Sequence, residues 1–168
     1  FPKGSEIITP DLTFSTTIGC IVKNELIPVF VDVEPLTYCI DCNKIEEMIT
    51  EKTVAILAPN LMGNLCDWPK IRKIANANDL IVIEDSADTI THTYETDVST
   101  TSFYASHIIT AGGTGGMVMF NDKLHLKRAE MYRDWGRIGN NIEAMTERFQ
   151  HTVDGIPYDF KFLYGVIG

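Results

Sequence analysis

The chain has 168 residues, which suits a single domain of roughly 150 residues. Hydrophobic residues make up 45% and charged residues 22%, a composition that excludes disordered, collagen-like and mucin-like chains. The 14 basic and 23 acidic residues give a net charge of −9, and because the acidic excess is scattered, a nucleic-acid partner is not expected. No stretch approaches the ~20 apolar residues of a membrane span, so no membrane partner is expected either.

The first part of the chain alternates between short apolar runs and segments with helical spacing. Residues 6–9 form a predicted strand, and residues 15–24 form a predicted helix. Residues 28–33 form a second strand that starts at a proline, where the missing N–H is tolerated. Apolar residues then recur at steps of three and four as far as Ile49, which predicts an amphipathic helix capped by Asp41.

The same alternation continues through the middle of the chain. Residues 54–58 form a third predicted strand, and residues 59–64 form a loop. A helical stripe runs over residues 68–75, with a proline in its first turn. Residues 80–83 form a fourth strand, which ends in the two acidic residues 84–85.

The rhythm changes after the fourth strand. Residues 89–101 are polar and rich in turn formers, and residues 102–105 form a short predicted strand. The glycine stretch 112–116 separates it from a further strand at 117–120, and a helix is predicted over 124–135.

Near-continuous Ile, Val and Leu strands joined through helices indicate an α/β fold, a mainly parallel sheet with helices on both faces. Open sheets of this kind bind ligands at the carboxyl ends of their strands. Polar or aromatic residues follow several of the predicted strands, which locates a candidate site at this edge of the sheet. These residues are Thr13, Phe14, Asn60, Asp85, Asp88, Ser102 and His107.

The four cysteines are even in number, but a disulfide-stapled secreted domain is shorter, denser in cysteine and poorer in core residues than this chain. Cys39 and Cys42 form a C-x-x-C motif, but neither Cys20 nor Cys66 supplies the second pair of a zinc finger. No metal site is therefore expected, and packing of free thiols in the core is favoured over redox chemistry. Reduced cysteines also favour a cytoplasmic location.

Asp85, His107 and the glycine stretch each have more than one possible role when considered alone. Asp85 is either a helix cap or loop anchor, or the counter-ion of a protonated heterocycle; a metal partner is less favoured. His107 is a proton shuttle, a metal ligand or a packing histidine, and packing is favoured. The glycine stretch lacks G-x-G-x-x-G spacing and a Walker lysine, which favours a turn with positive φ over a dinucleotide site.

Several motifs, in the same order along the chain, resemble the DegT-type (DegT/StrS) sugar aminotransferases, which are fold-type-I pyridoxal-phosphate (PLP) enzymes. The resemblance covers about residues 4 to 137. Its strongest matches are I-E-D-S-A-D at 83–88, S-F-Y-A-S-H at 102–107, the glycine stretch, and R-D-W-G-R at 133–137. Supporting matches lie at residues 8–14, 28–33 and 60–64.

This resemblance implies roles for the residues at the strand ends. Asp85 would pair with the pyridine nitrogen of the cofactor and keep it protonated, so that the ring acts as an electron sink. Phe14 would stack on the ring, Ser102 would contact the phosphate, and Asp88 would lie near the ring oxygen. His107 stands where the family has the lysine that forms a Schiff base with PLP, a bond that imidazole cannot make.

Two groups of nucleotide-sugar 3-dehydrases share this lysine-to-histidine change, and they also resemble this chain at residues 103–104 and in the E-D-x-x-D pattern of residues 84–88. In them, pyridoxamine phosphate (PMP) condenses with a 4-keto-6-deoxy sugar, and the histidine removes a proton while the C3 hydroxyl leaves. The ascarylose-type group carries a cysteine-ligated iron–sulfur cluster just after R-D-W-G-R. Because residues 138–150 contain no cysteine, the chain resembles the colitose-type group, and no iron–sulfur cluster is expected.

The resemblance thus implies a PLP/PMP-dependent 3-dehydrase that acts on a nucleotide-linked keto sugar, as a homodimer in the cytoplasm. A sugar aminotransferase of the same family and a truncated, inactive chain that only folds remain as alternatives. Residues 1–168 are expected to form the core of the large domain. The family's phosphate-binding segment is expected upstream of this core, and its small domain downstream.

Overall fold

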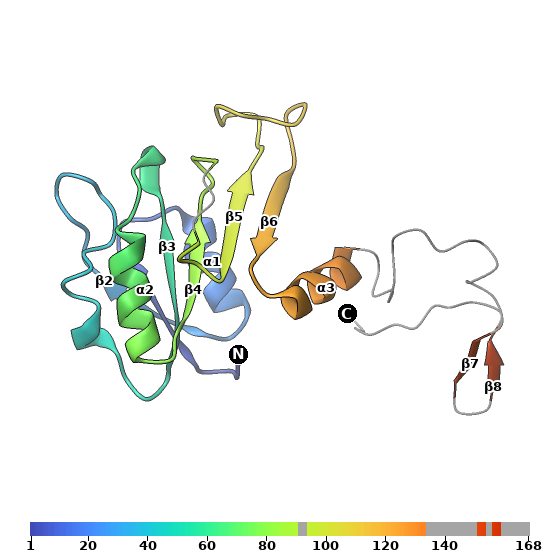
Figure 1. Ribbon diagram of the computed structural model, residues 1–168. Coiled ribbons are helices and arrows are strands. Elements are labelled where there is room, and N and C mark those ends of the chain that lie inside the picture. Colours follow the sequence, from blue (N-terminus) through green and yellow to red (C-terminus); the bar gives the residue numbers. More distant parts are fainter. Residues whose placement is uncertain (91–93, 134–150, 154–155, 159–168) are drawn as a thin grey trace. The chain divides into compact units, whose positions relative to one another are not determined.

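The structure is a computed structural model that describes residues 1–90, 94–133, 151–153 and 156–158. The chain divides into two compact units, Phe1–Asn121 and Asp122–Gly168. The first unit contains a six-stranded sheet with the strand order β2-β1-β3-β4-β5-β6 (Figure 1). Its strands are β1 (Glu6–Pro10), β2 (Ile27–Val31), β3 (Thr53–Pro59), β4 (Ile81–Asp85), β5 (Val98–Ser102) and β6 (Gly116–Phe120).

Strands β1 to β5 are parallel, and only β6, at one edge, runs antiparallel to its neighbour β5. The chain places β2 on one side of β1 and β3 on the other side. The order of the strands therefore reverses between β1 and β3, and ligands of open α/β sheets bind outside the carboxyl ends at such a reversal. The predicted mainly parallel α/β fold is confirmed.

Two helices cover opposite faces of this sheet, α1 (Ser15–Lys23) and α2 (Trp68–Ala77) (Figure 1). Alternate residues of a strand point to opposite faces, and on β3 Ile56 packs in the cluster around α2 while Ala55 and Leu57 pack in the cluster around α1. Because both faces of the sheet are buried, the central strands are nearly continuous apolar runs, and such runs predict strands from the sequence.

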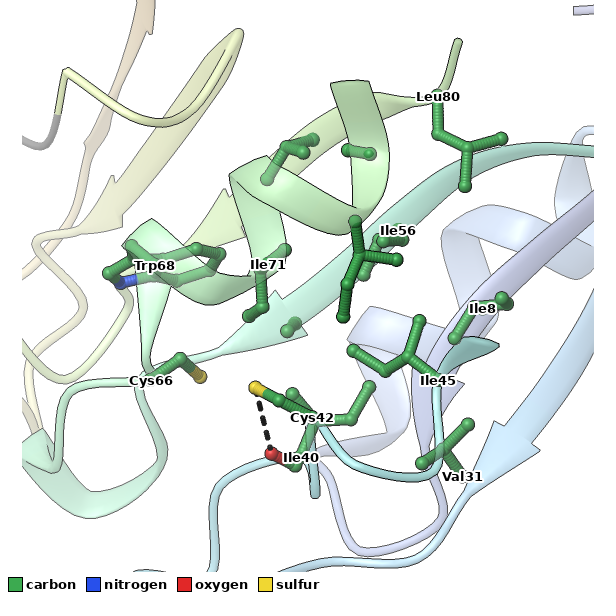
Figure 2. Close-up of a cluster of buried hydrophobic side chains, with 14 of the residues drawn as sticks. Ile8, Val31, Ile40, Cys42, Ile45, Ile56, Cys66, Trp68, Ile71 and Leu80 are labelled. Atoms are coloured by element: carbon green, nitrogen blue, oxygen red, sulfur yellow. Dashed lines mark hydrogen bonds between the residues drawn. The ribbon is translucent and has the colours of Figure 1, made fainter. Parts of the chain in front are cut away.

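The larger core cluster lies between the sheet and α2, and includes Trp68 and Ile71 of that helix (Figure 2). Asp67 caps α2 by accepting a hydrogen bond from the Lys70 amide at 3.1 Å, which stabilises the first turn. Cys42 is buried in this cluster as a free thiol, whose Sγ donates a hydrogen bond to the Ile40 carbonyl at 3.7 Å (Figure 2). Burial raises the pKa of this thiol to about 11, in keeping with the packing interpretation.

The predicted helix that follows Asp41 is wrong. Only a single 3₁₀ turn forms there, η1 (Glu46–Met48). The Asp41 side chain accepts a hydrogen bond from the Asn43 amide at 2.9 Å, which favours a local turn over a helix start. The apolar spacing nevertheless identified buried residues, because Ile45 is fully buried in the core.

The predicted strand at 102–105 is also misplaced, since β5 spans Val98–Ser102. Its sequence, V-S-T-T-S, is polar although Ser99 and Thr101 are buried, so no apolar pattern distinguishes it from the turn-rich residues before it. The glycine stretch does form a turn before β6, with positive φ at Gly112, Gly113 and Gly115, as predicted.

The predicted loop after β3 and the predicted helix near residue 124 are both present. A second 3₁₀ turn, η2 (Leu61–Gly63), follows β3 within the predicted loop. In the second unit, α3 (Lys123–Arg133) matches the predicted helix over its described residues, and residues 134–135 lie outside them. The same unit contains an antiparallel pair, β7 (His151–Val153) and β8 (Ile156–Tyr158). No helix in the described parts of the chain is long and apolar enough to cross a membrane.

Candidate functional site

The carboxylate of Asp85 lies at the carboxyl end of β4. The alternation of the strand places Asp85 on the same face as Ile83, the face that α1 covers. Its Oδ2 accepts a hydrogen bond from the Thr17 hydroxyl at 2.8 Å, and its Oδ1 accepts one from the Ala87 amide at 3.1 Å. A carboxylate offers about four lone-pair positions, so Asp85 can still accept further hydrogen bonds.

The ring of Phe14 is presented at the start of α1. Phe14 is the N-cap residue, has an extended backbone and is 70% exposed. Its carbonyl accepts a hydrogen bond from the Thr17 amide at 3.0 Å, within the first turn of the helix. An exposed aromatic face at a helix start is suited to stacking on a planar ligand.

Three of the predicted site residues line one cavity of about 510 Å³, namely Asp88, Ser102 and His107. The cavity lies beyond the ends of β4 and β5, and the rest of its lining is largely apolar. These apolar residues include Met62, Ile90, Ile108 and Ile109. Asp85 and Phe14 are not among the lining residues, so the predicted residues fall into two groups.

His107 lies in the connection between β5 and β6, and its hydrogen bonding determines its tautomer. Its Nδ1 lies 3.2 Å from the Ser102 carbonyl oxygen, which can only accept. In the neutral imidazole Nδ1 therefore carries the hydrogen, and Nε2 keeps a lone pair. Nε2 lies 4.0 Å from Oδ1 of Asp88, and the edge-on ring of Tyr104 is 6.0 Å away between centroids.

Asp88 and Ser102 have additional contacts that the sequence did not suggest. Oδ2 of Asp88 accepts a hydrogen bond from the Met62 amide at 3.0 Å, and Met62 has a φ of 56°, in the left-handed region. Asp88 thus stabilises a strained residue of the η2 turn. The Ser102 Oγ accepts a hydrogen bond from the Tyr104 amide at 3.2 Å, which leaves its own hydrogen available for a ligand.

Asn60 does not belong to the open site, contrary to the expectation from its place after β3. It is 1% exposed, and its amide nitrogen donates to Oε1 of Glu84 at 2.7 Å and to the Ser86 hydroxyl at 2.8 Å. Its oxygen accepts from the Cys66 amide at 3.0 Å and from the Trp68 indole at 3.1 Å. With both donors and both acceptor positions used, Asn60 is a structural residue.

Thr17 is the contact residue that sequence reasoning missed. It is buried on α1 together with Ile21, one turn later. A polar residue on the buried stripe of a helix was the available signal, because a buried hydroxyl needs a partner. The partner itself lies 68 positions away in the sequence, at Asp85.

The arrangement suits a planar aromatic cation better than a metal. Asp85 offers a charge, Phe14 offers a ring face, and Ser102 offers a hydroxyl for an anionic group. The buried Thr13 hydroxyl, beside Phe14, also has no hydrogen-bond partner among the described residues. Within the same residues, no group of three or more His, Cys, Asp or Glu side chains could hold a metal ion.

Known proteins resemble this chain both in sequence and in structure. The chain is 37% identical to the lipopolysaccharide biosynthesis protein RfbH of Salmonella typhimurium, over 98% of this chain and 40% of RfbH. It is 35% identical to the dTDP-4-dehydro-2,6-dideoxy-D-glucose 3-dehydratase of Saccharopolyspora spinosa, over 98% of this chain and 38% of that protein. The chain therefore spans about 40% of the length of these curated relatives.

Among solved structures, NtdA from Bacillus subtilis with bound cofactor PMP superposes with a TM-score of 0.79 and 32% identity, over 86% of this chain and 34% of NtdA. The sequence profile of the DegT/DnrJ/EryC1/StrS aminotransferase family matches residues 2–163. This match covers nearly the whole chain and agrees with the motifs and the sheet order described above. The chain therefore belongs to the DegT/DnrJ/EryC1/StrS aminotransferase family.

Proposed function

We propose that this chain provides the cofactor-binding core of a PLP/PMP-dependent enzyme that removes the 3-hydroxyl group of a nucleotide-linked 4-keto-6-deoxy sugar. The observation that carries the proposal is His107, an imidazole where the resemblance implies a Schiff-base lysine. The 3-dehydratase name of one relative and its dTDP-linked sugar support the reaction and the substrate class. The PMP bound by NtdA supports the cofactor.

The residues present can hold such a cofactor. When bound, its protonated ring supplies an electron sink for carbon–oxygen bond cleavage. Asp85 would accept a charge-assisted hydrogen bond from the ring nitrogen, and Phe14 would stack on the ring. Ser102 would donate its hydroxyl to the phosphate, and Asp88 would lie near the ring oxygen.

His107 would act as the general base. The Ser102 carbonyl holds the hydrogen on Nδ1, so Nε2 is the atom that accepts the proton. Asp88, 4.0 Å from Nε2, would then stabilise the imidazolium cation. The cavity lined by His107 and Asp88 is the place where the sugar would meet this base.

A sugar aminotransferase of the same family is the second candidate, and the name of the matching family favours it. The two candidates differ in the group at position 107, because transamination in this family depends on a lysine amine.

The same proposal has three further parts. Residues 1–168 form the core of the large domain, the protein is a homodimer, and it is located in the cytoplasm. The homodimer rests on the family resemblance alone. The cytoplasmic location is supported by the four cysteines, which are all free thiols. The cluster-free branch of the dehydrases is supported by the absence of cysteine from residues 138–150.

Replacement of His107 in the full-length protein tests the reaction. His107→Asn should keep its PMP affinity but lose dehydration by roughly 10²–10⁴-fold, because only proton transfer depends on the imidazole. His107→Lys should gain a covalent PLP adduct that borohydride makes permanent, detected as added mass on that lysine. The matched control is His125→Asn, at an exposed histidine of α3, which should leave dehydration unchanged.

Two results would contradict the proposal. The first is a borohydride-stable PLP adduct on a lysine of the unmodified protein, because it would reveal a Schiff-base lysine elsewhere. The second is undiminished dehydration by His107→Asn, followed as sugar product by mass spectrometry. Transamination by the unmodified protein, without dehydration, would select the aminotransferase instead.

A further inference from the structure

Thr17 connects the two residues that would hold the cofactor ring. Its side-chain hydroxyl donates to Oδ2 of Asp85 at 2.8 Å, and its backbone amide donates to the carbonyl of Phe14 at 3.0 Å. One residue thus joins the strand end that carries the carboxylate to the helix start that carries the aromatic ring.

We infer that Thr17 is a positioning residue that fixes the carboxylate of Asp85 relative to the start of α1, where Phe14 presents its ring, so that one ligand ring can meet both residues. The inference rests on the proposed function, since it assumes that Asp85 pairs with a cationic ring. It adds a residue to which neither the family motifs nor the proposed reaction gives a role.

The surroundings of Thr17 make it a rigid connection. It is 4% exposed and lies in the first turn of α1, where its neighbours hold it against the sheet. A threonine side chain is branched at Cβ, which leaves it two main χ1 rotamers in a helix. The hydrogen bond to Asp85 selects the rotamer that directs the hydroxyl at the carboxylate.

The other contact of Asp85 explains why Thr17 controls the orientation of the carboxylate. The Ala87 amide holds Oδ1 at 3.1 Å, and the Thr17 hydroxyl holds Oδ2. With one donor on each oxygen, rotation about χ2 is restricted, and the remaining lone pairs point in fixed directions. Without the hydroxyl, the Ala87 amide would be the one remaining restraint on the carboxylate among the described residues.

The negative charge of Asp85 also acts on Cys20, which lies one turn after Thr17 on α1. Burial, and after it the negative charge of Asp85, raise the pKa of the Cys20 thiol above its ordinary value. The Cys20 Sγ donates to the Thr17 carbonyl at 3.1 Å. The side of α1 that carries Thr17 and Cys20 therefore lies close to Asp85.

The test uses Thr17→Val, which keeps the shape of the side chain and removes the hydroxyl, and Thr17→Ser, which keeps the hydroxyl. In the full-length protein, Thr17→Val should weaken PMP binding about tenfold in equilibrium dialysis, because hydrogen bonds to charged groups are the stronger ones. Thr17→Ser should restore most of the affinity. The matched control Thr16→Val, at the exposed neighbour, should bind as the unmodified protein does.

A spectroscopic measurement separates positioning from packing. A correctly placed Asp85 keeps the ring nitrogen of bound PLP protonated to higher pH. In Thr17→Val the absorbance change that reports loss of this proton should therefore move to lower pH, whereas a packing defect would leave it in place. In an Asp85→Asn background, Thr17→Val should add little to the loss of affinity.

The outcomes distinguish this inference from the proposed function. If Asp85→Asn weakens PMP binding and Thr17→Val does not, the positioning role is overturned and the proposed cofactor site stands. If Asp85→Asn has no effect, the ring partner assigned to Asp85 is wrong, and the inference falls with it. A Thr17→Val protein that unfolds more easily, with an unmoved absorbance transition, would make Thr17 a packing residue and would also overturn the inference.

Discussion

Glu84 and Asp85 are neighbouring carboxylates at the end of β4, and the alternation of the strand directs them to opposite faces of the sheet. On the α2 side, Glu84 is 0% exposed and accepts hydrogen bonds from Asn60 at 2.7 Å and from the Ser86 hydroxyl at 2.6 Å. On the α1 side, Asp85 is only partly buried and is held by Thr17 and Ala87.

The comparison shows how a carboxylate can serve either the structure of the core or the binding of a ligand, depending on its surroundings. The carboxylate of Glu84 belongs to a buried network whose other members include the Thr96 hydroxyl at 3.3 Å, and such networks specify a core when their members are satisfied. Asp85 keeps lone pairs and access to solvent, which a ligand requires. The two residues are adjacent in the sequence, so their position in the chain does not explain their different roles. The difference is that Asp85 can accept further hydrogen bonds from a ligand.

The largest effect on stability is expected from Asn60→Ala, which breaks the network on the α2 side. The substitution removes four hydrogen bonds and leaves two buried donors, the Cys66 amide and the Trp68 indole N–H, without the oxygen that accepts from them. Since each buried unsatisfied group costs about 1–3 kcal/mol, we expect a loss of about 3 kcal/mol or more in the free energy of unfolding, measured with urea.

Asn64→Ala is the matched control for this substitution. Asn64 is exposed, and within the described residues its side-chain amide makes a single hydrogen bond, to the Thr37 carbonyl at 2.9 Å. Its removal should cost about 1 kcal/mol or less. Equal losses for the two variants would show that the buried network does not stabilise the fold as described.

A smaller effect, on binding rather than on stability, is expected on the α1 side. Asp85→Asn should weaken PMP binding by roughly tenfold to a hundredfold, because it replaces a charge-assisted hydrogen bond with a neutral one. Asp88→Asn should weaken binding only a few-fold, since an asparagine oxygen can still accept from the Met62 amide. Titration of both full-length variants with PMP measures the difference.

The two variants serve as controls for each other, because both exchange a carboxylate for an amide near the same strand ends. Urea unfolding should show that neither loses as much stability as Asn60→Ala. Equal PMP affinities of Asp85→Asn and Asp88→Asn would contradict the roles assigned to the two residues.

The sequence predicted the features that follow from apolar spacing. The parallel strands β1 to β4 and the helices α1 and α2 were identified because their buried faces repeat at strand or helix period. The carboxyl edge was located because strand ends of a parallel sheet meet there. The positions of Asp85 and His107 at this edge followed from these elements and from the family motifs. For Ser102 only the motifs support this position, because the predicted strand began at this residue, whereas β5 ends there.

Other features depend on contacts between residues that are far apart in the sequence, and no local pattern predicts such contacts. Strand β5 is polar and buried, so no apolar pattern marks it. Asn60 follows a strand just as Asp85 does, yet its partners on α2 and β4 bury it. The contact between Thr17 on α1 and Asp85 on β4 joins elements that are separated by 68 residues, and β4 lies two positions along the sheet from β1, the strand that precedes α1.

The smallest expected effect uses Cys20 as a reporter of the charge on Asp85. Burial and then the Asp85 carboxylate raise the pKa of the Cys20 thiol. A nearby negative charge disfavours the thiolate, so Asp85→Asn should lower this pKa and increase the thiolate fraction at a fixed, mildly alkaline pH. Because the thiolate is the nucleophile, iodoacetamide should then alkylate Cys20 modestly faster than in the unmodified protein.

Mass spectrometry of the Cys20 peptide measures this rate, while the buried thiols of Cys39, Cys42 and Cys66 are protected by the fold. Asp88→Asn makes the same chemical change at a residue that does not act on Cys20, so its alkylation rate should stay at the unmodified value. An unchanged rate in Asp85→Asn would mean that this carboxylate is not charged beside α1. In that case a change in PMP affinity caused by Asp85→Asn could not be ascribed to the loss of a negative charge, and the contrast between the two faces of β4 would rest on burial alone.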